Sequence, residues 1–289
     1  MDAKPNQILQ NNQYPMQTDT PTQPKKFDLL THILSNEQVA QDHYLLSCMC
    51  PEIASSALPG QFIHVLISQG DALLLRRPFT IYTVEGDQLS MLYQRIGDGT
   101  AALSRLKHGA LLRVLGPLGN TFRIPSDLNP AILVGGGAGI ASLMLLAVAL
   151  RQSGVRTLGL VGSMNRARLL SVADLKKIGV ETYIATDDGS VGHHGFVTEL
   201  LTEILEGTQV YARHQPVIYA CGPNGMLRAV TKIVQDYRIP TQLAMENRMG
   251  CAMGVCLGCV CKVRTTDGGF EYQRVCTEGP VFDAKDIVW

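Results

Sequence analysis

The sequence has no excess of charge of either sign. Lys and Arg together number 25, and so do Asp and Glu, which gives a formal net charge of zero. Proteins that bind nucleic acid or an anionic membrane surface usually carry an excess of basic residues. The composition therefore favours neither nucleic acid nor a membrane among the partners of this chain.

Long hydrophobic runs are also missing. The longest apolar run, Ile140 to Leu150, falls well short of the roughly 20 apolar residues that cross a bilayer. Residues 1–26 have neither the basic start nor the apolar centre of a signal peptide. We therefore expect a cytoplasmic protein, in which the eight cysteines indicate metal or redox chemistry more often than disulfides.

Four cysteines near the end of the chain have a distinctive spacing. They follow the pattern Cys251-x4-Cys256-x2-Cys259, and Cys276 comes after a further sixteen residues. A plant-type 2Fe-2S cluster uses this triplet, with the fourth thiolate supplied by a more distant segment. Glycines interspersed in the triplet would let the backbone approach the cluster and turn its amides toward the sulfurs.

A structural zinc site is the alternative, because four cysteines also suffice for zinc. Zinc sites favour paired Cys-x2-Cys units, and only one such pair is present here, so the spacing favours iron and sulfur. Cys261 stands outside the set of four. Cys48, Cys50 and Cys221 are scattered, and we expect them to be small buried side chains.

The chain divides into four segments by composition and pattern. Residues 1–26 are rich in Asn, Gln, Pro and Thr, which predicts a disordered polar tail. Residues 27–128 contain short apolar runs separated by turn residues, which predicts a small antiparallel barrel. Residues 129–244 alternate strand-like and helix-like segments, which predicts a parallel sheet covered on both faces. Residues 245–289 hold the four cysteines as a small carboxyl-terminal domain.

The expected elements have approximate bounds. In the barrel, strands are predicted at 27–35, 43–50, 61–68, 77–84, 88–94 and 110–115, with a helical turn at 103–107. In the second domain, strands are predicted at 131–134, 157–161, 181–185 and 216–220, and helices at 140–152, 167–178, 197–205 and 225–236.

The sequence Arg77-Pro78-Phe79-Thr80 can hold a flavin. The guanidinium fork of Arg77 matches a pyrophosphate, and Thr80 would reach the edge of the isoalloxazine ring. A barrel strand with solvent-exposed arginines is the alternative. The later turn at Gly99-Thr100 favours the flavin, because its amides and hydroxyl can bind phosphate at the start of a short helix.

A glycine-rich turn lies between the first strand and the first helix of the second domain. Gly135, Gly136, Gly137 and Gly139 could bring backbone amides to the pyrophosphate of a dinucleotide. The turn does not fit the Gly-x-Gly-x-x-Gly fingerprint, and no acidic residue closes the next strand. Arg166 and Arg168 follow that strand and could accept a 2′-phosphate, with ordinary surface arginines as the alternative.

Two loops follow further predicted strands of the second domain. One contains Asp187, and the other begins with Cys221-Gly222. In an open parallel sheet the ligand lies outside the carboxyl ends of the strands, so both loops are candidates to border a nicotinamide. Ordinary turn chemistry is the alternative for each loop taken singly.

Taken together, these motifs resemble the electron transfer subunit of dihydroorotate dehydrogenase, an iron-sulfur flavoprotein of the ferredoxin-NADP reductase-like superfamily. The resemblance covers residues 27–289 and includes the ending from Arg274 to Phe282, which reads Arg-Val-Cys-Thr-Glu-Gly-Pro-Val-Phe. The chain departs from the family at Ser142, where many relatives have proline, and at Thr80, where serine is common.

The resemblance implies three cofactors and their residues. FAD would be bound by Arg77, Pro78, Phe79, Thr80, Leu92, Tyr93, Gln94, Gly99 and Thr100. A 2Fe-2S cluster would be held by Cys251, Cys256, Cys259 and Cys276. NAD would occupy the parallel-sheet domain near its glycine turn.

The resemblance also implies a partner, a catalytic subunit that carries FMN and oxidises dihydroorotate, in a heterotetramer of two copies of each. Electrons would pass from FMN through the cluster and FAD to NAD⁺ in pyrimidine (UMP) biosynthesis, and no residue of this chain is expected to act as an acid or base. One alternative is a reductase subunit of another complex, such as a hydrogenase or a glutamate synthase-like enzyme. Another is a zinc-stabilised nucleotide-binding regulator without turnover.

Overall fold

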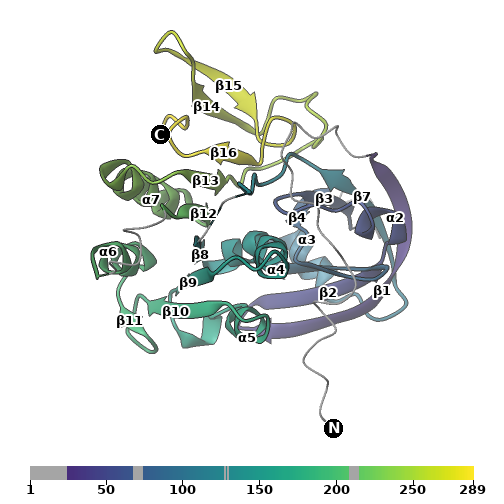
Figure 1. Cartoon of the computed structure of the whole chain (residues 1–289). Coiled ribbons are helices and arrows are strands. Elements are labelled where there is room, and N and C mark those ends of the chain that lie inside the picture. Colours follow the sequence, from purple (N-terminus) through teal and green to yellow (C-terminus); the bar gives the residue numbers. More distant parts are fainter. Residues whose placement is uncertain (1–24, 68–73, 127, 129, 208–214) are drawn as a thin grey trace.

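The computed structural model describes residues 25–67, 74–126, 128, 130–207 and 215–289. Figure 1 shows an antiparallel barrel, a second sheet flanked by helices, and a small carboxyl-terminal part that lies against both. Of the polar tail expected at residues 1–26, only Lys25 and Lys26 belong to the described residues. Among the helices of the described chain, none is long and apolar enough to cross a membrane.

The first sheet is antiparallel throughout and has the strand order β4-β3-β7-β1-β2-β6-β5. Its strands are β1 (Phe27–Ala40), β2 (His43–Met49), β3 (Phe62–Leu66), β4 (Arg77–Thr80), β5 (Thr83–Glu85), β6 (Gln88–Gln94) and β7 (Leu111–Leu118). Ile33, Leu46 and Val114 are fully buried inside it. The sheet curls on itself and brings the first strand in this order close to β6. Phe79 of β4 packs edge-on against Tyr93 of β6, with ring centroids 5.7 Å apart. The predicted antiparallel barrel is confirmed.

The strand expected at 77–84 is in fact two strands, β4 and β5. The chain changes partner between adjacent residues: Ile81 N donates to Gln61 O (3.3 Å) beside β3, whereas Tyr82 N donates to Ser90 O (2.8 Å) on β6. One continuous strand cannot pair with both neighbours, so the ladder breaks there.

The helical turn expected at 103–107 was placed too late in the chain. Helix α3 spans Asp98–Leu103 and is preceded by Gly97 in an extended conformation. A second short helix, α2 (Pro51–Ala54), was not predicted. It begins with proline, whose fixed φ suits the first turn of a helix.

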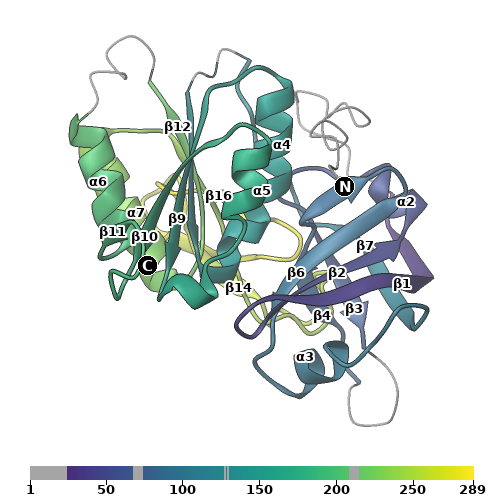
Figure 2. The same cartoon turned by 90° about the horizontal axis from the view of Figure 1, so that it is seen from below.

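The second sheet has the order β11-β10-β9-β8-β12-β13-β16. Its strands are β8 (Ala131–Gly136), β9 (Thr157–Ser163), β10 (Glu181–Thr186), β11 (His193–His194), β12 (Val217–Cys221), β13 (Thr241–Ala244) and β16 (Val281–Asp283). Its helices are α4 (Met144–Gln152), α5 (Val172–Lys177), α6 (Val197–Gly207) and α7 (Asn224–Tyr237), with short 3-10 turns at Gly137–Leu143 and Arg166–Arg168. Figure 2 shows α4 and α5 on one face and α6 and α7 on the other.

This arrangement confirms the predicted parallel sheet covered on both faces. Every residue of β8, β9 and β12 is buried, because a central parallel strand is covered from both sides. The edge strand β16 was not predicted. It runs antiparallel to β13, pairing Leu243 with Phe282, so the end of the chain completes a sheet built from the middle of the chain.

The carboxyl-terminal part contains the hairpin β14 (Val260–Arg264) and β15 (Phe270–Arg274). Its buried Cys259, Val275 and Cys276 belong to one apolar cluster with Phe62 of the barrel and Leu243 of the second sheet. The cysteine segment therefore packs where the two sheets meet, rather than hanging from the end of the chain.

Candidate functional site

One cavity of about 720 Å³ lies against the barrel, and we call it the barrel cavity. Several predicted flavin residues line it: Arg77, Pro78, Phe79, Thr80, Leu92, Tyr93, Gln94 and Thr100. They come from β4, β6 and α3, which are brought side by side by the curl of the sheet. Sequence-distant residues are therefore gathered on one wall.

Arg77 and Tyr93 are fixed in this wall by specific contacts. A methyl group added at Gly99 would lie 2.5 Å from Arg77 Nε, so the glycine lets the guanidinium rest against the first turn of α3. The Tyr93 hydroxyl donates to Asn36 Oδ1 (2.9 Å), and its ring stacks on Tyr44 with centroids 5.5 Å apart. Burial raises the pKa of Tyr93, so it stays a neutral donor.

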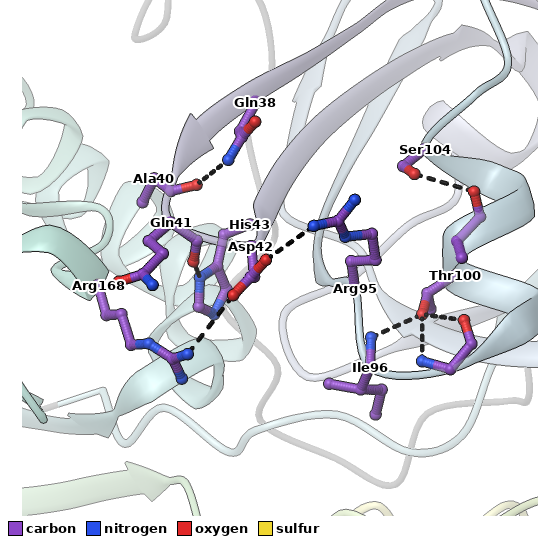
Figure 3. Close-up of polar contacts among 12 residues, drawn as sticks. Gln38, Ala40, Gln41, Asp42, His43, Arg95, Ile96, Thr100, Ser104 and Arg168 are labelled. Atoms are coloured by element: carbon purple, nitrogen blue, oxygen red, sulfur yellow. Dashed lines mark hydrogen bonds and ion pairs between the residues drawn. The ribbon is translucent and has the colours of Figure 1, made fainter.

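Thr100 has a different role from the one expected of it. Its hydroxyl accepts a hydrogen bond from Ile96 N (2.9 Å), as Figure 3 shows, and another from Gly97 N (3.2 Å). The hydroxyl thus stabilises the turn that begins α3. Of the residues of this turn, Ile96 and Thr100 line the barrel cavity, whereas Gly97, Asp98 and Gly99 do not.

A second cavity of about 810 Å³, the nucleotide cavity, lies at the carboxyl ends of the parallel strands. Of the predicted nucleotide residues, Gly136, Gly137, Gly139, Asp187 and Gly222 line it. Gly135 lines neither cavity, and Cys221 lines the barrel cavity instead.

The glycine turn is packed directly against the loop after β12. A methyl group on Gly139 would lie 2.5 Å from the backbone oxygen of Cys221, a distance that no side chain tolerates. Glycine at this position allows the turn after β8 and the loop after β12 to form one continuous wall. This close packing, and not a match to a dinucleotide fingerprint, explains why residue 139 is glycine.

The two cavities meet at three residues that line both of them, Gln94, Ala138 and Glu246. Glu246 Oε1 lies 3.9 Å from the buried Sγ of Cys221. Burial raises the pKa of the Glu246 carboxyl, and burial together with Glu246 raises the pKa of the Cys221 thiol. The Glu246 side chain is accessible from both cavities, so molecules in the two cavities would meet beside it.

Sequence reasoning missed Glu246 and His43, which also lines the nucleotide cavity. Glu246 lies just past the carboxyl end of β13. The rule that ligands lie beyond the ends of parallel strands would have found it, had the short strand β13 been predicted. His43 offered no comparable signal, since it is the first residue of a barrel strand.

The cysteine loop, residues 250–259, directs backbone amides at a sulfur. Cys251 Sγ accepts hydrogen bonds from Met253 N (3.4 Å) and Cys256 N (3.4 Å). Ala252 and Leu257 have φ of 54° and 55°, the left-handed conformation that turns successive amides to one side. The amide of Met253, with that of Cys256, lowers the pKa of the Cys251 thiol to about 6, which favours the thiolate.

The four predicted cysteines lie as two pairs. Cys251 is hydrogen-bonded to Cys256 near the surface, whereas Cys259 and Cys276 are each 2% exposed and hydrogen-bonded to one another. Burial, with neighbouring Cys259, raises the pKa of Cys276 to about 11. Across the described ranges, no three His, Cys, Asp or Glu side chains are grouped closely enough to hold a metal ion as they stand.

The cysteine residues nevertheless fit an iron-sulfur cluster. Methyl groups on Gly250 and Gly258 would lie 3.5 and 3.6 Å from Cys256 Sγ, in ordinary van der Waals contact, so the two glycines leave additional space near this sulfur. Arg274 Nη1 donates to Gly254 O (3.0 Å) and ties the segment of Cys276 to the loop. Four soft thiol ligands with inward-facing amides suit iron and sulfide.

The chain is similar in sequence to known iron-sulfur proteins. Residues 246–288 match the model of the iron-sulfur cluster binding domain of dihydroorotate dehydrogenase B. The chain is 34% identical to the dihydroorotate dehydrogenase B (NAD(+)) electron transfer subunit of Bacillus mycoides, over 89% of this chain and 96% of that protein. The subunit from Bacillus cereus gives the same values.

The chain belongs to the family of dihydroorotate dehydrogenase B electron transfer subunits. The family resemblance expected from the sequence is thereby confirmed. A solved structure of an NADH-dependent reduced ferredoxin-NADP oxidoreductase is 26% identical, with a TM-score of 0.79 over 90% of each chain. The ferredoxin reductase of carbazole 1,9a-dioxygenase, at 19% identity and a TM-score of 0.62 over 74% of this chain and 67% of that one, shares the fold.

Proposed function

We propose that this chain is the electron transfer subunit of an NAD-dependent dihydroorotate dehydrogenase, linking the FMN of a catalytic subunit to NAD⁺. One observation carries the proposal above all. The barrel cavity and the nucleotide cavity share Glu246, and residues 247–249, which lead directly into the cysteine loop, line the barrel cavity. Cluster, flavin and nucleotide sites are thus consecutive along a single path.

FAD occupies the barrel cavity in this proposal. Arg77 would bind its phosphates, and Thr80 on β4 would contact its ring. Leu92, Tyr93 and Gln94 form the wall behind it, with Pro78 and Phe79. When bound, the flavin would supply the chemistry that combines two single electrons from the cluster with a proton and passes them on as a hydride.

NAD(H) occupies the nucleotide cavity. The turn at Gly136, Gly137 and Gly139 presents amides to the pyrophosphate, and Asp187 and Gly222 border the rest of the nucleotide. Gly135 and Cys221 are buried and lie next to residues of this wall, so they support it without lining the nucleotide cavity. Glu246 places a carboxyl group at the junction of the two cavities, within reach of both molecules.

The cluster is bound by Cys251, Cys256, Cys259 and Cys276. The amides around Cys251 stabilise negative charge on sulfur, and the buried pair anchors the loop to the protein. We assign residues 27–128 to FAD, 129–244 to NAD and 245–289 to the cluster, with strand β16 of the last segment completing the NAD sheet.

The catalytic subunit binds where the cysteine loop reaches the surface. Met253, Val255 and Leu257 are 55%, 78% and 61% exposed beside the cluster ligands, and exposed apolar residues in one loop indicate a protein contact. The assembly is a heterotetramer of two copies of each subunit, in the cytoplasm, and its product serves pyrimidine biosynthesis.

An anaerobic visible spectrum of the purified complex, with iron and sulfide analysis, tests this proposal. We expect flavin absorption, about two irons and two sulfides per chain, and bleaching on addition of either NADH or dihydroorotate. Zinc in place of iron, with no flavin, would identify a structural regulator instead. Bleaching by NADH alone would indicate a reductase with another partner.

A further inference from the structure

Arg168 is the one permanent cation among the described residues that line the nucleotide cavity. The only other basic side chain there is His43, and burial, its largest influence, lowers its pKa. A dinucleotide brings two negative charges on its pyrophosphate, and a guanidinium fork matches phosphate oxygens. Arg168 is therefore the side chain best suited to meet a phosphate in this cavity.

Arg168 is occupied by another partner in the structure. Its Nη2 lies 3.5 Å from Asp42 Oδ2, whereas Asp42 Oδ1 lies only 3.0 Å from Arg95 Nη2 (Figure 3). Asp42 is thus shared between an arginine of the barrel and one of the nucleotide-binding sheet. The contact to Arg168 is the longer and weaker of the two, and both of its side chains are partly exposed, at 28% and 30%.

The junction of the two domains does not depend on this ion pair. Gln41 N donates to Ala167 O (3.0 Å) next to it, and the Tyr82 hydroxyl donates to Asp174 Oδ2 (2.5 Å) at a separate point. Arg168 can therefore leave Asp42 without parting the barrel from the sheet. Asp42 would keep Arg95 as its partner.

Resting on the proposed function, we propose that Arg168 changes partner when the dinucleotide binds, from Asp42 to a phosphate of the ligand. Asp42 is a positioning residue that holds the Arg168 guanidinium in the wall of the nucleotide cavity and competes with the ligand for it. Nucleotide affinity then depends on a residue of the barrel that lies outside both cavities.

NAD⁺ titrated calorimetrically into the fully oxidised holoenzyme complex tests this exchange, because no electrons are then available to reduce the ligand. Arg168→Ala should weaken binding about ten- to a hundredfold, the usual effect of losing a hydrogen bond between charged groups. Asp42→Asn should tighten it about two- to fivefold, since a weak exposed ion pair no longer competes. The double variant should bind like Arg168→Ala alone.

A matched control is Glu181→Gln, which removes the exposed Arg156–Glu181 ion pair (3.1 Å) of the same sheet. It should leave NAD⁺ affinity unchanged. Flavin and iron content of each variant shows that the protein is intact. The exchange is overturned if Asp42→Asn behaves like Glu181→Gln, or if its effect persists in the Arg168→Ala background.

Parallel titrations with NADP⁺ identify the phosphate that Arg168 meets. If Asp42→Asn raises the affinity for NAD⁺ and NADP⁺ equally, Arg168 meets the pyrophosphate. If it raises the affinity for NADP⁺ more, Arg168 meets the 2′-phosphate. Normal NAD⁺ affinity in all variants would remove the exchange and leave the proposed function intact. Absence of NAD⁺ binding by the unmodified enzyme would remove both.

Discussion

The nucleotide-binding sheet and the cysteine loop hold their site residues by opposite means. The sheet places its glycine turn after β8, which is wholly buried, and Asp187 after β10, whose last two residues are buried, so packing fixes their positions. The cysteine loop has no regular structure between residues 250 and 259, and fixes Cys251 by turning amides toward it through left-handed residues. One region derives its geometry from the core, the other from its own backbone.

This difference accounts for the two pairs in which the four proposed cluster ligands lie. A strand end keeps its shape whether or not a ligand is bound, because burial of neighbouring strands stabilises it. A short loop around a cluster gains much of its final order from the metal bonds themselves. Core packing holds the buried Cys259 and Cys276, which we call the fixed half of the proposed site. Cys251 and Cys256 are more exposed and depend on the loop backbone alone, so we call them the adjustable half.

The largest expected effect comes from breaking the fixed half with Cys259→Ser. Serine is a poor ligand for iron, so iron and sulfide should fall from about two each per chain to near zero. FAD should remain bound, and NADH should still bleach it, because the barrel and nucleotide cavities do not contain Cys259. Metal analysis and the visible spectrum measure both effects.

Cys261→Ser is the control, since Cys261 is two residues along and half-buried on β14. It should keep its iron. A full complement of iron in Cys259→Ser, or its loss in Cys261→Ser, would show that the ligand set differs from the one proposed.

The next effect belongs to the nucleotide-binding sheet. Gly139→Ala adds a methyl group 2.5 Å from the Cys221 backbone oxygen, and backbone cannot move aside as a flexible side chain can. We expect a loss of about 1–3 kcal/mol in the free energy of unfolding, as for other overpacked sites, and weaker NAD⁺ binding. Denaturant unfolding and calorimetric titration measure these.

Gly225→Ala gives the matched comparison, because a methyl group there meets nothing within 4 Å although Gly225 also lines the nucleotide cavity. It lies in the first turn of α7, where alanine should be neutral or stabilising by up to about 1 kcal/mol. Equal destabilisation by the two substitutions would mean that the close packing at Gly139 is not what requires glycine.

The contrast between the buried sheet and the cysteine loop also determines which elements can be predicted from the sequence. The strands β8, β9 and β12 were predicted because burial on both faces demands unbroken apolar runs. Strand β13 was not predicted, because it is short and contains the polar residue Gln242. The Gln242 side chain is buried, and it is hydrogen-bonded to the backbone of Arg123. With β13 missing, Glu246 at its end was missed as well.

The cysteine ligands could be proposed from spacing alone, since a cluster loop is a local feature of the sequence. Two other features could not. The start of α3 contains Gly97 and Gly99, which are poor helix formers and indicate a turn. The pairing of β16 with β13 joins segments that are remote along the chain, and no local pattern predicts it.

A smaller effect is expected at the surface of the cysteine loop. Met253→Asp places a charge in the exposed apolar set with Val255 and Leu257, and desolvating it in an interface should weaken assembly with the catalytic subunit about tenfold or more. Cluster and flavin content should not change. Analytical ultracentrifugation of the mixed subunits gives the dissociation constant.

Tyr237→Asp serves as its control, because Tyr237 is also exposed (39%) but lies at the end of α7 in the nucleotide-binding part. Assembly should be unaffected by it. If Met253→Asp assembled as well as the unmodified chain, the apolar residues of the loop would not form the contact.

The smallest effect tests how the two halves of the cluster site are tied together. Arg274 donates to Glu278 through its backbone N and two guanidinium nitrogens, and this partner lowers the pKa of the Glu278 carboxyl to about 2. A lowered pKa means that the stabilisation is complete above the ordinary pKa of about 4.3 and disappears as the pH falls toward 2. Because both side chains are about one-third exposed (36% and 32%), solvent screening limits it to about 1 kcal/mol or less.

Glu278→Gln should therefore lower the melting temperature slightly at pH 7 and lose this difference from the unmodified chain as the pH falls below about 4. Glu271→Gln, at an exposed carboxylate on neighbouring β15, should show no such pH-dependent difference. Thermal unfolding between pH 3 and pH 7 measures both. The opposite result would be a melting-temperature difference between Glu278→Gln and the unmodified chain that grows toward low pH. It would mean that the charged form of Glu278 destabilises the folded chain. The hydrogen bond from Arg274 to Gly254 would then be the contact that ties the loop to Cys276.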